Sequence, residues 1–129
     1  MAEIATTELE EFSYKRIAVK PIAGALGAEI EGVDIADGVD QETQDEIYRA
    51  WLEHNVVFFR NQSITPPQQI KFAKRFGEIH VHLFNKAMDE HPEITEVLKT
   101  PVMKSNAGGR WHSDQMYTPK PAKATMLYS

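Results

Sequence analysis

The segment ITPPQQIKFAKRFG, residues 64–77, constrains the fold most strongly because it specifies both ends of a helix. Thr65 stands at the N-cap, and Pro66 follows at the first helical position, where the missing N–H of proline costs nothing. Gln68 completes a capping box with Thr65, and Gly77 lies just past the expected end. The buried stripe of this helix is expected to contain Ile70, Ala73 and Phe76.

The segments before this helix predict two strands, a helix and a further strand. Residues 17–34 show short apolar alternations broken by proline and glycine, which predict two strands joined by a glycine-rich turn. Residues 40–55 predict an amphipathic helix that begins at the N-cap Asp40 and packs Trp51 in the core. The continuous apolar run at 56–60 predicts a short buried strand.

The later segments predict strands without further helices. Residues 93–99 and 122–129 are rich in β-forming residues, and residues 79–84 place His80 and His82 on one face if the segment is extended. Helices early in the chain and strands late indicate an α+β fold whose sheet is incomplete. We expect residues 1–16 to be a flexible acidic segment and residues 17–129 to belong to one domain.

The composition excludes several classes of function. With 14 Lys and Arg against 19 Asp and Glu, the 129-residue chain has a formal charge of −5, so it lacks the basic field that nucleic acid or an anionic membrane surface requires. It contains no cysteine, so any metal site must use His, Asp or Glu. No secretory leader and no long apolar span is evident, and we expect a cytoplasmic protein.

The motif WHSD, residues 111–114, carries the clearest chemical signal. His112 and Asp114 are two residues apart and share a face if the segment is extended. Such a pair is two-thirds of the two-histidine, one-carboxylate triad that holds non-haem Fe(II). Spacing alone leaves a second interpretation open, in which a solvated loop histidine stands beside a turn-forming aspartate.

Four motifs in a fixed order carry a family resemblance. They are PIAGALGAEIEGVDI, HNVVFFRNQSITPPQQIKFAKRFGEIHVH, WHSD and PKPAKATMLYS. Their order and separations resemble the N-terminal part of the taurine/alpha-ketoglutarate dioxygenase (TauD/TfdA) family of Fe(II)- and 2-oxoglutarate-dependent oxygenases. The resemblance covers nearly all of this chain but less than half of a family member.

The resemblance implies a fold, a cofactor and site residues. It implies the opening part of a double-stranded β-helix, or jelly roll, with supporting helices. It implies that His112 and Asp114 bind Fe(II), that His82 contacts a small anionic substrate, and that 2-oxoglutarate and O₂ are cosubstrates. The second iron histidine and the arginine that binds 2-oxoglutarate are expected beyond residue 129, so we expect this chain alone to be inactive. A homo-oligomer is compatible with the family.

Neighbouring residues modify this interpretation. Trp111 and Tyr117 flank the expected ligands and could line a pocket, whereas Arg110 could bind an anion or simply face solvent. Two departures from the taurine enzyme argue against taurine itself as the substrate. They are the Gly108–Gly109 pair before the WHSD motif, and Asn85 where that enzyme has a tyrosine.

Three alternatives remain open from the residues alone. A zinc site could be assembled from His80, His82, His112 and Asp114, which are suitable zinc ligands. The chain could also be a truncated relative that keeps the scaffold as a non-catalytic binding module. Finally, WHSD could be accidental in an unrelated α+β domain.

Overall fold

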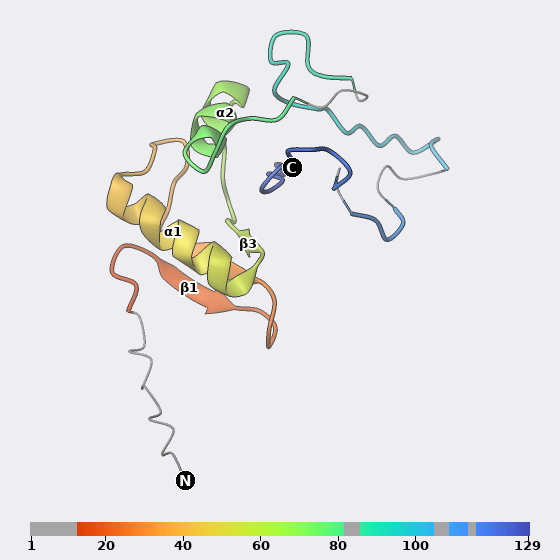
Figure 1. Ribbon diagram of the computed structural model, residues 1–129. Helices are drawn as coiled ribbons and strands as arrows, with labels where there is room; N and C mark the ends of the chain where they lie inside the picture. Colours follow the sequence, from red (N-terminus) through yellow and green to blue (C-terminus); the bar gives the residue numbers. More distant parts are fainter. Residues whose placement is uncertain (1–12, 82–85, 105–108, 114–115) are drawn as a thin grey trace. The chain divides into compact units, whose positions relative to one another are not determined.

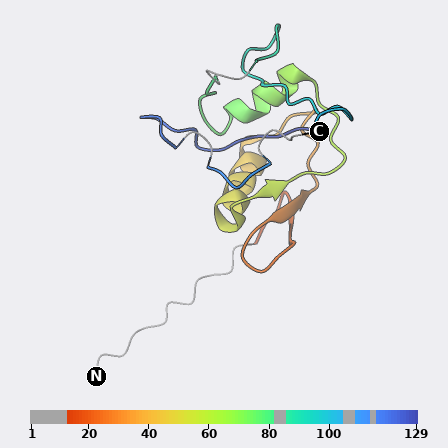
Figure 2. The same ribbon diagram turned by 90° about the vertical axis from the view of Figure 1, so that its right-hand side faces the viewer.

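A computed structural model describes residues 13–81, 86–104, 109–113 and 116–129 (Figures 1 and 2). The chain divides into two compact units. The first unit comprises Met1–Asp34 and Val39–Gln62, and the second comprises Ile35–Gly38 and Ser63–Ser129. The described residues form an α+β structure with two helices and a three-stranded sheet, which confirms the predicted α+β class. The expected jelly roll stays a prediction, because the described strands form one sheet.

The first unit begins with the predicted pair of strands. Strand β1 (Ala18–Pro21) pairs antiparallel with β2 (Ala28–Glu31). The turn between them ends at Gly27, whose φ of +92° is in the left-handed region and whose added Cβ would lie 3.1 Å from the side chain of Ile22. The backbone conformation therefore favours glycine at this position, and a larger residue would also have to displace the exposed side chain of Ile22.

The predicted helix follows as α1 (Gln41–His54), which lies against the sheet in Figure 1. Asp40 is the N-cap, and its Oδ1 accepts a 2.8 Å hydrogen bond from the Thr43 backbone N–H. Asn55 ends the helix with a φ of 62°. Trp51 is half-buried rather than in the core, with its ring 5.6 Å from that of Tyr48 in an edge arrangement.

Strand β3 (Val57–Phe58) pairs with β2 in the parallel direction, and α1 is the crossover between them. The sheet order is β1-β2-β3. The predicted strand is therefore correct in place but shorter than expected, and both of its residues are half-buried rather than buried. An edge position explains this, because β3 pairs with one neighbour among the described strands.

A buried carboxylate joins α1 to the chain that enters β1. Glu46 is 9% exposed, and its two oxygens accept hydrogen bonds from the backbone N–H groups of Lys15 (2.8 Å), Arg16 (2.9 Å) and Ile17 (3.2 Å). Burial by itself raises the pKa of Glu46, but these three donors and the charge of Arg16 outweigh it and hold the pKa below its ordinary value. Glu46 is therefore ionised in the folded chain at neutral pH.

Further contacts reinforce the same junction. The guanidinium of Arg16 donates to Glu42 on α1, and the Tyr14 hydroxyl donates to Glu53 at 2.9 Å. Burial and the Glu53 carboxylate raise the pKa of Tyr14 to about 12. Residues 1–16 were expected to be flexible. Residues 1–12 lie outside the described residues, and the last three residues of the segment, Tyr14, Lys15 and Arg16, are hydrogen-bonded to α1.

The second unit contains α2 (Pro66–Lys74), which begins at the predicted N-cap Thr65. The capping box is present, since Gln68 Oε1 accepts from the Thr65 backbone N–H at 2.7 Å. The Nε2 of Gln68 donates to the carbonyl of Ala36, which holds the short segment Ile35–Gly38 to the helix. The residues expected to form the buried stripe, Ile70, Ala73 and Phe76, are half-buried, and Phe72 is the buried residue of this helix.

The late strands predicted from sequence are wrong within the described residues. Residues 93–99 form one isolated bridge, between Ala87 and Thr95, and residues 122–129 form no strand. Residues 79–81 are not a strand either, and 82–84 lie outside the described residues. Alternating apolar residues favour an extended backbone, but a strand exists only where a neighbouring chain supplies its hydrogen bonds.

Each unit has a small core of aliphatic residues. The first is built from Ile17, Ala28, Ile30, Ile47 and Ala50, and the second from Ile35, Ile64 and Phe72. Within the described ranges, neither helix has the length and apolar character needed to cross a membrane.

We predict that Glu46→Ala destabilises the chain by about 2 to 3 kcal/mol, because it leaves three backbone donors without their charged acceptor. Urea unfolding followed by far-UV circular dichroism measures this change. Asp45→Asn is the matched control, since Asp45 is exposed on the same helix and accepts a bond from Gln41. The control should change stability by less than about 0.5 kcal/mol. Equal effects of the two substitutions would contradict the role of Glu46.

We also predict a pH dependence that Glu46→Gln removes. The folded pKa of Glu46 is depressed, so its contribution is fully present above the unfolded pKa of about 4.3 and is lost as pH falls through the folded value. The stability difference between wild type and Glu46→Gln should therefore be constant near neutral pH and shrink in acid. Unfolding curves recorded from pH 7 to pH 3 test this, and a difference that grows in acid would reverse the assignment.

Candidate functional site

The loop at residues 109–113 carries the first candidate metal ligand. His112 is exposed, and its Nδ1 lies 2.6 Å from the backbone carbonyl oxygen of Arg110. A carbonyl oxygen only accepts, so Nδ1 must carry the proton, and in the neutral ring the lone pair is then on Nε2. This is the arrangement by which metal-binding histidines are commonly oriented. Asp114, the second candidate ligand, lies outside the described residues.

The residues that flank this loop face solvent. Trp111 is fully exposed, Tyr117 is 73% exposed, and Arg110 is exposed as well. Among the described residues, Trp111 and Tyr117 therefore do not line a pocket. The contact that Arg110 makes with His112 comes from its backbone carbonyl oxygen and not from its side chain.

The histidine pair near residue 80 is only partly described. His80 is exposed, and His82, the candidate substrate ligand, lies outside the described residues. Among the residues that are described, no three His, Asp or Glu side chains come together to hold a metal ion. The four-ligand zinc interpretation requires His82 and Asp114 and receives no support from the rest of the chain.

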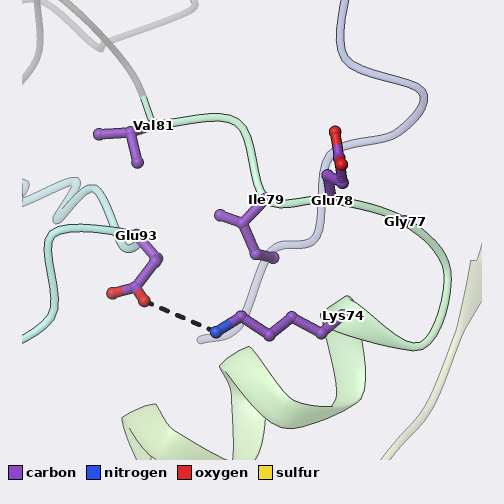
Figure 3. Close-up of a pocket in the computed structure, with 6 residues that line it drawn as sticks. All are labelled: Lys74, Gly77, Glu78, Ile79, Val81 and Glu93. Atoms are coloured by element: carbon purple, nitrogen blue, oxygen red, sulfur yellow. Dashed lines mark ion pairs between the residues drawn. The ribbon is translucent and has the colours of Figure 1, made fainter.

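An open hollow lies beside the segment that leads to His82. It has a volume of ≈ 490 Å³ and is lined by Lys74, Gly77, Glu78, Ile79, Val81 and Glu93 (Figure 3). Ile79 reaches toward the ion pair of Lys74 and Glu93, whose Nζ and Oε1 are 3.9 Å apart. The charged residues of the lining are one lysine, Lys74, and two glutamates, Glu78 and Glu93, so the hollow carries no excess positive charge that would attract an anion.

A second ion pair involves the same segment. Lys120 Nζ donates to Glu78 Oε2 at 2.8 Å. This hydrogen bond and the attraction between the charges lower the pKa of Glu78 and raise that of Lys120. Sequence analysis missed these two ion pairs, because nothing in local spacing signals a contact between residues far apart in the sequence.

Residues 18–129 match the family described as taurine catabolism dioxygenase TauD, TfdA family, so the chain belongs to this family. The match includes the WHSD motif and all the helices and strands named above. The family resemblance inferred from the four sequence motifs is therefore confirmed.

Two curated relatives show the range of this similarity. The (S)-phenoxypropionate/alpha-ketoglutarate-dioxygenase of Sphingobium herbicidovorans is 30% identical over 116 residues, which cover 84% of this chain and 39% of the relative. The alpha-ketoglutarate-dependent sulfate ester dioxygenase of Pseudomonas putida is 33% identical over 112 residues, which cover 86% of this chain and 36% of the relative. The chain thus spans less than two-fifths of the length of either relative.

The similarity extends to three dimensions. A crystal structure of a taurine dioxygenase from Burkholderia xenovorans superposes with a TM-score of 0.59 at 36% identity, over 66% of this chain and 32% of that one. The described α+β structure is therefore similar to part of the fold of that taurine dioxygenase.

Proposed function

We propose that this chain provides the first two iron ligands of an Fe(II)- and 2-oxoglutarate-dependent dioxygenase that hydroxylates a small anionic organic molecule and releases succinate and CO₂. The family match over residues 18–129 is the observation that carries this proposal, because it includes His112 and Asp114. The relatives named for phenoxypropionate and sulfate ester substrates support an anionic substrate.

The described part of the site is compatible with a metal ion. His112 has the tautomer that leaves a lone pair on Nε2, and an imidazole nitrogen is a common ligand of Fe(II). Asp114 would add a carboxylate oxygen from two residues further on. When bound, Fe(II) with 2-oxoglutarate supplies the oxidising power that inserts one oxygen atom of O₂ into a C–H bond and the other into succinate.

The remaining ligands are proposed to come from a C-terminal portion. The family resemblance implies that the second iron histidine and the 2-oxoglutarate arginine follow the equivalent of Ser129. The greater length of the relatives supports this placement, since this chain covers 39% and 36% of them. That portion would also complete the proposed jelly roll by supplying neighbours to residues 93–99 and 122–129, which form no strand in the described chain.

His82 is proposed to hold the anionic group of the substrate. A protonated imidazole or its N–H donor binds carboxylate or sulfonate oxygens through a charge-assisted hydrogen bond. His80, two residues earlier, is exposed and is assigned no contact with the substrate.

We predict that His112→Ala and Asp114→Ala each reduce 2-oxoglutarate turnover by more than about 100-fold, because even residues that only orient a metal ligand cost 10–100-fold when they are removed. The measurement is substrate-dependent release of succinate by the protein expressed from the complete gene. Far-UV circular dichroism should stay near wild type for both variants. Undiminished turnover in either variant would refute the metal assignment.

His82→Ala should raise the KM for the substrate about tenfold or more and leave the KM for 2-oxoglutarate unchanged, because one charge-assisted hydrogen bond to the substrate is lost. His80→Ala is the matched control and should change neither constant. Equal increases for substrate and 2-oxoglutarate would indicate a structural role for His82 instead.

Residues 1–129 alone should not release succinate from 2-oxoglutarate, because two protein ligands hold Fe(II) weakly and the far carboxylate of 2-oxoglutarate has no arginine partner. The same assay, applied to the 129-residue chain and to the product of the complete gene, measures the difference. Normal turnover by the 129-residue chain would show that the whole site lies within it, whereas an inactive complete product would favour a non-catalytic relative.

A further inference from the structure

Two contacts hold residues 120–128 against the two ends of α2. At one end, Lys120 Nζ donates to Glu78, which lies four residues past the last residue of the helix. At the other end, the hydroxyl oxygen of Tyr128 accepts a 3.2 Å hydrogen bond from the backbone N–H of Ile64, two residues before the helix begins. We call residues 120–128 the strap.

The strap connects the two parts of the proposed site along the sequence. The loop with His112 and Asp114 immediately precedes it, and its first residue is Lys120. The residue bound by Lys120 is Glu78, and the segment with His80 and His82 follows Glu78 directly. The Glu78–Lys120 contact therefore joins the chain leaving the metal loop to the chain entering the substrate segment.

We propose that Glu78, Lys120 and Tyr128 are positioning residues, which fix the strap on α2 and thereby set the metal-binding loop relative to the substrate-binding segment. This inference rests on the proposed function. None of the three residues is assigned contact with iron, 2-oxoglutarate or substrate.

The two contacts differ in environment. The side chains of Lys120 and Glu78 are 88% and 87% exposed, so solvent screens their attraction and the pair adds little to global stability. Ile64 is 8% exposed, so the Tyr128 contact reaches a buried backbone. Because the ion pair is weak and the second contact is a single hydrogen bond, their loss should loosen the strap locally rather than unfold the unit.

The test is amide hydrogen exchange on the protein expressed from the complete gene, for wild type, Lys120→Gln, Tyr128→Phe and the double variant. Exchange at residues 109–118 should accelerate about two- to five-fold in each single variant and further in the double variant. Lys71→Gln is the matched control, because Lys71 is an exposed lysine of α2 that neither contact uses. The charge-exchanged pair Glu78→Lys with Lys120→Glu should restore slow exchange.

Steady-state kinetics separate positioning from simple tethering. The KM for the substrate should rise two- to five-fold in the double variant, while the KM for 2-oxoglutarate stays unchanged. Unaltered amide exchange at residues 109–118 would overturn the proposal, even if the protein catalyses a different reaction. Faster exchange with an unaltered KM for the substrate would show that the strap holds the loop but does not position it for substrate binding. If wild type releases no succinate, the proposed function fails, and the exchange result alone then decides whether the strap holds the loop.

Discussion

The burial of one carboxylate organises the first unit of this protein. A charged group inside a protein is tolerated only when hydrogen bonds replace its lost hydration, and the three backbone donors around Glu46 do so. Those donors belong to the residues that lead into β1, so the helix and the edge of the sheet are fixed to each other by polar bonds as well as by the packing of Ile47 and Ala50. Burial of Glu46 is favourable only when these donors are in place, so the packing of α1 and the ordering of the residues that lead into β1 stabilise each other.

The features predicted correctly from sequence are those with local causes. Asp40 and the Thr65–Gln68 box lie within four residues of the groups they cap, so the starts of both helices follow from short stretches of sequence. Glu46 was not recognised as important, because its partners are about thirty residues away and its position on the helix is that of an ordinary acidic residue. The prediction of strands at 93–99 and 122–129 was wrong for the converse reason. These residues have a local preference for strands, but no described segment pairs with them to continue the sheet.

The candidate site shows the same division between local and distant causes. His112 was predicted as a ligand from a histidine and an aspartate two residues apart, and the family match includes both positions. The ligand role stays a prediction, because Asp114 lies outside the described residues. The ion pair of Glu78 and Lys120, to which we assign a positioning role, was not predicted from the sequence. Such contacts become visible only when the chain is folded, because opposite charges are frequent on any protein surface and few of them meet.

The orientation of His112 has a consequence for how this loop can evolve. Its ring is held by the main-chain oxygen of Arg110, and every amino acid offers that same oxygen. The side chain at position 110 can therefore vary among relatives, to suit different substrates, without disturbing the tautomer of the histidine beside it. If His112 binds the metal as proposed, the side chain at position 110 could change while the orientation of the ligand beside it is kept.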